Sequence, residues 1–359
     1  MIDKSITIAA TPTGDFYLSE KTYEAAKEKI FTTTWQYIGT AAHFQDKGYL
    51  YPIDFMPECL NEPLVLSVQE EGITLMSNVC THRGYILITE KSKSQIIRCK
   101  YHGRCFHPDG KFLSMPEFEA AENFPTQMDN LKNIHVENWN GLLFGALFPK
   151  MTIHELLKGI TDRISWFPFD KLVFREDLSQ DYTIKANWAL YCDNYLEGFH
   201  IPFVHKSLNK VIDYNNYETH LFEYGNLQLG IAKDGELVFD LPADSPDYGK
   251  KVGAYYYWIF PNMMFNFYPW GLSLNIVQPQ GKDDTKVSFL IFIHDESKYN
   301  QGAGSDLNRV EMEDEEVVES VHKGLQSRLY HRGRYSPKME TGVHQFHLLL
   351  NQFLQADLD

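Results

Sequence analysis

Short apolar runs separated by turn signals dominate the first part of the chain, after a charged helical start. In the first residues, charged and apolar positions follow a helical pattern, and Ser19 is a suitable N-cap. Further on, the apolar runs are strand-like and are separated by turn pairs such as Asp109-Gly110. The pattern predicts an N-terminal helical segment over residues 1–34 and a small all-β domain over residues 35–150.

Residues 151–359 combine the strand and helix periodicities. A short helix capped by Thr152 is predicted first, and residues 217–295 contain several strands. Two amphipathic helices follow, over residues 306–329 and 340–358. The pattern predicts a second, larger domain that mixes strands and helices.

The first of these helices carries an acid on its apolar face. The spacing of Asp314, Val318, Val321 and Leu325 places all four on one face of a helix. Because the other three are apolar, we expect the carboxylate of Asp314 to point inward. The other acids of this helix are expected on the solvent side, namely Glu311, Glu315, Glu316 and Glu319.

Residues 187–205 contain the most suggestive chemistry. His200 follows Glu197 by three positions, and His205 comes five positions later. Imidazole nitrogens with a carboxylate oxygen are ligands that suit a divalent first-row metal with open coordination positions. Histidines this close also serve as ordinary hydrogen-bonded core residues, so the stretch alone does not decide between these interpretations.

Pro202 lies between the two histidines, so one uninterrupted helix is not expected to carry both. The pattern predicts a helix that ends near Ile201, with His205 returning from the next turn. Asp193 lies one helical turn before Glu197, which predicts that the two acids share a face.

Composition narrows the function classes. The net charge of −15 over 359 residues argues against nucleic acid as a partner, because phosphates are bound by Lys and Arg. The apolar runs are too short to span a membrane, and the start has no secretory signal, so a cytoplasmic protein is expected. Five cysteines are too few and too irregular for a disulfide framework.

Four of the Cys and His residues form two compact pairs in the predicted β domain. Cys80 and His82 form the first pair, and Cys99 and His102 form the second. Two cysteines and two histidines would accept a structural zinc ion. They are also the ligand set of a Rieske [2Fe–2S] cluster, and the order Cys-His then Cys-His favours the cluster over a zinc finger.

These motifs resemble those of Rieske-type non-haem iron oxygenases, the aromatic-ring-hydroxylating dioxygenase alpha-subunit family. CTHRG at 80–84 and CKYHG at 99–103 resemble its Rieske motif, and residues 193–205 resemble its mononuclear iron motif. The resemblance covers nearly the whole chain. Arg104 departs from it, because the family often has Trp there, so the packing beside the cluster is expected to differ.

The resemblance implies an α+β chain, in which a Rieske all-β domain precedes a helix-grip (START-like) catalytic domain over residues 151–359. In that catalytic domain an antiparallel sheet is covered by C-terminal helices, and the segment 1–34 packs on it. The family binds Fe(II) with two histidines and a carboxylate from a late helix. This implies His200, His205 and Asp314 as iron ligands, with Glu313 as the alternative acid.

The resemblance also implies roles for residues around the iron. The acid at Glu197 would join His200 to the cluster ligand His102 of a neighbouring subunit in a homotrimer, although the family more often has Asp there. Asp193 is the alternative for this role. Asn187 and Asn194 are expected to donate hydrogen bonds near the iron.

The implied activity is that of a terminal oxygenase, which uses O2 and NAD(P)H-derived electrons from a separate reductase, directly or through a ferredoxin. The substrate would be a small organic molecule, hydroxylated or oxidatively demethylated. An aromatic band between Tyr255 and Trp270 would suit an aromatic ring or a quaternary amine. The sequence NYLEGFH resembles most the branch of the family that oxidises choline or carnitine.

The residues alone are also compatible with two other functions. An electron-transfer Rieske protein would lack the mononuclear iron, and a zinc-stabilised binding module would have no redox role.

Overall fold

The computed structural model describes residues 2–355, and the chain divides into two compact units. One unit is Phe31–Lys150, and the other joins Met1–Ile30 to Met151–Asp359. The N-terminal helical segment therefore belongs to the same unit as the C-terminal part of the chain.

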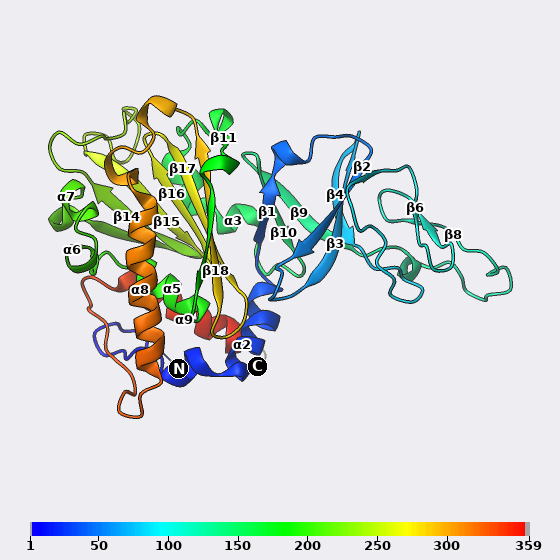
Figure 1. The fold of residues 1–359 in the computed structure, drawn as a ribbon, viewed down its shortest axis with the longest axis horizontal. Helices are drawn as coiled ribbons and strands as arrows, with labels where there is room; N and C mark the ends of the chain where they lie inside the picture. Colours follow the sequence, from blue (N-terminus) through cyan, green and yellow to red (C-terminus); the bar gives the residue numbers. More distant parts are fainter. Residues whose placement is uncertain (1, 356–359) are drawn as a thin grey trace. The chain divides into compact units, whose positions relative to one another are not determined.

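The unit Phe31–Lys150 is built of β-strands (Figure 1). Its antiparallel main sheet has the order β1-β10-β9-β4-β3-β2-β5, and β6-β7-β8 form a second, smaller sheet. The strands are β1 (Gln36–Thr40), β2 (Tyr49–Phe55), β3 (Glu62–Gln69), β4 (Gly72–Ser77), β5 (Ser92–Lys93), β6 (Ile97–Arg98), β7 (Cys105–Phe106), β8 (Phe112–Ser114), β9 (Asn133–Trp139) and β10 (Leu142–Ala146). The predicted all-β character is confirmed.

The second unit is organised around a larger antiparallel sheet with the order β11-β18-β17-β16-β15-β14-β13, and β12 also pairs with β18. Its strands are β11 (Val173–Phe174), β12 (Gln180–Ile184), β13 (Glu218–Phe222), β14 (Gly225–Ile231), β15 (Val252–Ile259), β16 (Met263–Tyr268), β17 (Gly271–Pro279) and β18 (Thr285–Ile293). The long central strands are almost fully buried, so both faces of the sheet are covered.

Helices flank this sheet, and α8 runs across it as the longest of them (Figure 1). Helix α9 is held on the sheet by aromatic contacts, because the Phe346 ring lies 5.0 Å from Trp258 and the Phe353 ring lies 4.6 Å from Phe260. The helices are α1 (Gly14–Leu18), α2 (Glu20–Ala26), α3 (Ile153–Leu156), α4 (Lys158–Ile164), α5 (Trp188–Tyr195), α6 (Ile201–Val204), α7 (Leu208–Val211), α8 (Leu307–Leu325) and α9 (Thr341–Gln355).

Two predicted helix caps are confirmed. The Ser19 side chain accepts a hydrogen bond from the Thr22 amide at the start of α2. Thr152 and Glu155 form a reciprocal capping box at the start of α3, which satisfies amides that a helix leaves unpaired. The last predicted helix begins one residue late, at Thr341, and its expected end at Leu358 lies outside the described residues.

The prediction of a helix that ends near Ile201 is wrong. Helix α5 ends at Tyr195, and α6 begins at Ile201 as a separate short helix. Pro202 lies in the first turn of α6, where its missing amide proton is not needed, so it starts a helix here and does not end one. The shared face predicted for Asp193 and Glu197 is wrong for the same reason, because α5 ends between them.

None of the helices formed by residues 2–355 has both the length and the apolar character that crossing a bilayer requires.

Candidate metal centres

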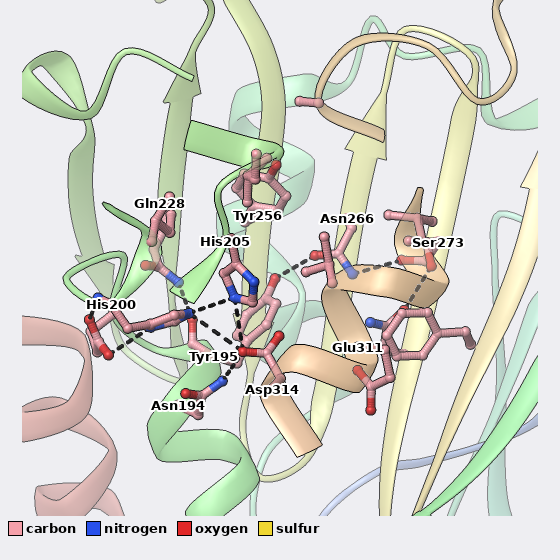
Figure 2. Close-up of a pocket in the computed structure, with 18 of the residues that line it drawn as sticks. Asn194, Tyr195, His200, His205, Gln228, Tyr256, Asn266, Ser273, Glu311 and Asp314 are labelled. Carbon is pink, nitrogen blue, oxygen red and sulfur yellow. Dashed lines mark hydrogen bonds and ion pairs between the residues drawn. The ribbon is translucent and has the colours of Figure 1, made fainter. Parts of the chain in front are cut away.

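Three side chains from two distant parts of the chain converge in the second unit (Figure 2). The Nε2 atoms of His200 and His205 lie 3.0 Å apart, and Asp314 Oδ1 lies 3.0 Å from His205 Nε2. Asp314 Oδ1 is also 3.5 Å from His200 Nε2. One potential ligand atom from each residue thus faces a common point, all within 4.8 Å of one another.

The local backbone explains how the two histidines face each other. His200 is the N-cap of α6 and His205 is its C-cap, so one short helical turn separates the rings. Gly198 precedes this turn, and a Cβ there would lie 2.6 Å from the Tyr217 ring. Glycine is therefore required for the close approach of Tyr217, which lies beside the histidines.

Each of the three side chains is held by a further hydrogen bond. Glu197 Oε1 lies 2.8 Å from His200 Nδ1, and Glu313 Oε2 lies 2.9 Å from His205 Nδ1. Asn194 donates from its amide to Asp314 Oδ1 at 2.6 Å. Both imidazoles thus use Nδ1 for orientation and leave Nε2 for the common point, as in metal sites where carboxylates orient the ligating histidines.

The electrostatics follow from these contacts. Burial alone would lower the pKa of His205, but hydrogen bonds to Asp314 and Glu313 and their charges outweigh burial, so its pKa is raised. For Glu313, burial acts to raise the pKa, and the contacts with His205 and Arg309 lower it overall.

The donor set fits a divalent metal ion of the iron type. Two imidazole nitrogens and one carboxylate oxygen are the donors that would hold such an ion as a facial triad. Asp314 has the position expected of the acid ligand. Glu313, the alternative acid, instead contacts the outer nitrogen of His205.

Asp193 and Asn187 lie elsewhere. Asp193 accepts a hydrogen bond from Tyr17 at 2.7 Å and pairs with His347 at 2.9 Å. Asn187 caps α5 by accepting from the Ala189 amide, and its own amide donates to the carbonyl of Tyr17. Both residues therefore connect the N-terminal segment to the rest of the second unit, and neither belongs to the group of three converging side chains.

A cavity opens beside the converging side chains. Tyrosine rings and amide or hydroxyl groups form much of its wall (Figure 2), namely Tyr191, Tyr195, Tyr217, Tyr256, Tyr268, Asn194, Gln228, Asn266, Ser273 and Asn275. Of the aromatic residues between Tyr255 and Trp270, Tyr256 and Tyr268 reach the cavity. Strand pairing places Tyr256 opposite Asn266, and both contribute to the wall.

Glu311 contradicts its predicted place on the solvent side of α8. It is 1% exposed and lines the cavity, one helical turn before Asp314. Burial, and then the charge of Asp314, raise the pKa of Glu311 well above its usual range. The predicted apolar stripe is also only partly right, since Val318 is buried and Val321 is 45% exposed.

In the β unit, the two Cys-His pairs lie on neighbouring loops. The His82 and His102 rings are 4.8 Å apart, and Cys80 and Cys99 belong to one buried cluster. In each loop a glycine with positive φ returns its amide to the carbonyl of the cysteine, Gly84 to Cys80 and Gly103 to Cys99. Two buried thiols beside two adjacent imidazoles fit the donor set of a Rieske cluster.

Arg104 stabilises this arrangement from inside the unit. It is 2% exposed, and its guanidinium pairs with Asp129 at 2.6 Å. The carbonyl of Asp129 also accepts from the Thr81 hydroxyl at 2.8 Å, which connects the two loops. The guanidinium lies over three aromatic rings, those of Phe106, Phe112 and Phe124.

Comparison with protein families matches both units. The model described as "Ring hydroxylating alpha subunit (catalytic domain)" matches residues 169–356, which is more than half of the chain. The model described as "Rieske [2Fe-2S] domain" matches residues 34–125.

Curated relatives match along nearly the full chain. Choline monooxygenase of Arabidopsis thaliana is 29% identical over 97% of this chain and 83% of its own length. The carnitine monooxygenase oxygenase subunit of Escherichia coli K12 is 26% identical over 94% of this chain and 92% of its own length.

Solved structures share the fold. A quaternary ammonium Rieske monooxygenase in complex with L-carnitine has a TM-score of 0.74 at 23% identity, and covers 97% of this chain and 96% of its own. Naphthalene 1,2-dioxygenase from Rhodococcus sp. has a TM-score of 0.71 at 17% identity, and covers 98% of this chain and 95% of its own.

We expect His205→Ala to remove one metal ion and leave the cluster intact. Iron should fall from about three atoms per chain to about two, with the visible spectrum of the [2Fe–2S] cluster unchanged. Iron and acid-labile sulfide analysis, together with the optical spectrum, measures this. His220→Ala is the matched control, because His220 is partly exposed and pairs with Glu218 away from the cavity. Loss of the cluster colour in His205→Ala would contradict the assignment.

Proposed function

The chain belongs to the ring-hydroxylating alpha-subunit family, and on that premise we propose that His200, His205 and Asp314 hold the mononuclear Fe(II) of a Rieske-type oxygenase. The observation that carries this assignment is the convergence of the three ligand atoms at the wall of a cavity. Cys80, His82, Cys99 and His102 are the proposed ligands of the Rieske cluster.

When bound, the iron and the cluster supply the electrons and the oxygen-binding position for inserting oxygen into a substrate bond. The chain's own residues set the geometry. Glu197 and Glu313 hold the two imidazoles by their Nδ1 atoms, and Asn194 holds Asp314. The tyrosine-lined wall positions the substrate and separates the reacting bond from bulk water.

A quaternary ammonium compound is the substrate class that we favour. The relatives with the names choline and carnitine monooxygenase support it, and so does the cavity wall. Among the described residues that line the cavity there is no Lys or Arg, while tyrosine faces attract an ammonium group through cation–π interactions.

Electrons are proposed to come from NAD(P)H through a separate reductase. The chain has no G-x-G-x-x-G motif between a strand and a helix that would bind the nicotinamide or a flavin.

We propose a homotrimer in which the electron passes between subunits. Exposed apolar side chains flank both centres, Phe199 and Phe203 beside His200, and Tyr85 and Tyr101 beside the cluster histidines. Exposed apolar groups at both ends of the route are what a subunit interface would cover. Glu197, which bonds the backbone amide and the ring of His200, would also bond His102 of the partner subunit.

A turnover screen with a surrogate reductase tests the substrate class. We expect NADH oxidation coupled to product with choline, carnitine or another quaternary amine, and none with aromatic acids. Product is measured by mass spectrometry beside oxygen uptake. Coupled turnover of aromatic acids alone would contradict the proposed class.

Glu197→Gln is expected to keep both metals and to slow transfer of the electron to the iron by about 10- to 100-fold, because a charged carboxylate that orients a ligand histidine is lost. Stopped-flow oxidation of the pre-reduced cluster in a single turnover measures the rate. Glu218→Gln makes the same chemical change at a partly exposed pair with Lys250 and serves as the control. An unchanged rate in Glu197→Gln would exclude the bridging role.

A further inference from the structure

Glu311 is a buried acid with no side chain of opposite charge beside it among the described residues that line the cavity. Its Oε2 accepts a hydrogen bond from the Tyr191 hydroxyl, which holds the carboxyl group against α5. Its Oε1 is buried and has no hydrogen-bond partner among the described residues. Removing a carboxylate from water is costly unless a cation or further hydrogen bonds compensate it.

No Lys or Arg pairs with Glu311 among the described residues that line the cavity. Among the described residues that line the cavity, the only other groups that can be charged are the acids Glu197 and Asp314 and the histidines His200 and His205. Glu197 and the histidines are already hydrogen-bonded to one another or to Asp314. Glu311 thus lines the cavity with one carboxyl oxygen that no described protein group binds.

Tyrosine rings form another part of the cavity wall, and like a carboxylate they attract cations. The cavity wall includes Tyr195, Tyr256 and Tyr268, and the Tyr256 and Tyr268 rings lie 6.0 Å apart at nearly a right angle. The Tyr195 hydroxyl is fixed by Asn266 at 2.7 Å. Rings held in this way attract cations with their faces, whereas a carboxylate adds a full formal charge.

We propose that Glu311 is the counter-ion for the ammonium group of the substrate. This inference rests on the proposed function, since it gives the same cavity a specificity-determining residue. Tyr191 fixes the direction of the carboxylate from α5, and the tyrosine rings surround the apolar parts of the cation. Because Glu311 lies one helical turn before Asp314, the ammonium end of the substrate is the end held near the iron ligands.

The experiment compares the binding of a cationic ligand with that of an uncharged analogue of nearly the same shape. Choline and 3,3-dimethylbutan-1-ol have nearly the same shape, and only choline is charged. Both are titrated into the metal-loaded wild type and into Glu311→Gln by calorimetry. The variant should bind choline about 10- to 100-fold more weakly and bind the neutral alcohol as well as the wild type does.

Glu316→Gln is the matched control, because it makes the same change on the exposed side of the same helix. It should bind both compounds as the wild type does. A purely structural role for the Tyr191–Glu311 contact would weaken both ligands equally in Glu311→Gln, and that result would overturn the proposal. So would a wild type that binds choline no better than the alcohol.

The turnover screen separates this inference from the proposed function. If the wild type oxidises a quaternary amine while Glu311→Gln retains full affinity for choline, the counter-ion role is wrong and the proposed function stands. If the wild type neither oxidises nor binds any quaternary amine, the proposed substrate class fails, and the counter-ion role fails with it.

Discussion

The chemistry of this protein depends on the packing of helix α8 against the segment that runs from α5 to α6. This packing brings Asp314 within 3.0 Å of His205, although 109 positions separate them in the chain. The acceptor atoms of two imidazoles and a carboxylate are stable side by side only when a metal ion or protons lie between them. The contact therefore forms a site for a cation. Glu197, Glu313 and Asn194 hold the three groups in place from outside.

The same packing forms the cavity beside them. Helices α5 and α8 carry Tyr191 and Glu311 to one side of it, and the sheet supplies Tyr256, Asn266 and Tyr268 on the other. Four buried polar residues of the sheet line the cavity, namely Gln228, Asn266, Ser273 and Asn275. A rigid sheet behind the cavity and two helices in front suit a site whose reacting groups must be placed accurately.

Much of the architecture could be predicted from the sequence, because spacing within a motif is local. The Cys-His pairs, the two histidines around Pro202 and the inward Asp314 all depend on a few neighbouring residues. Glu311 could not be predicted in this way. Its spacing of three and seven positions to Asp314 and Val318 places it on their face of α8, but an acid is expected in solvent, and only the contact with Tyr191, 120 positions away, shows that it is buried. Tyr195 and Tyr217 also line the cavity and were not predicted, because distant contacts place them there. Helix α5 ends at Tyr195, earlier than expected, and Pro202 lies in the first turn of the next helix.

The most direct test of the account is a single turnover with labelled oxygen. The metal-loaded protein is reduced without air, mixed with a quaternary amine that supports turnover, and exposed to ¹⁸O2. The account predicts an oxidised product that carries one labelled atom, or labelled aldehyde where a methyl group is removed, together with oxidation of the cluster. Oxidation of the cluster with no oxygenated product would contradict it, and would leave only electron transfer.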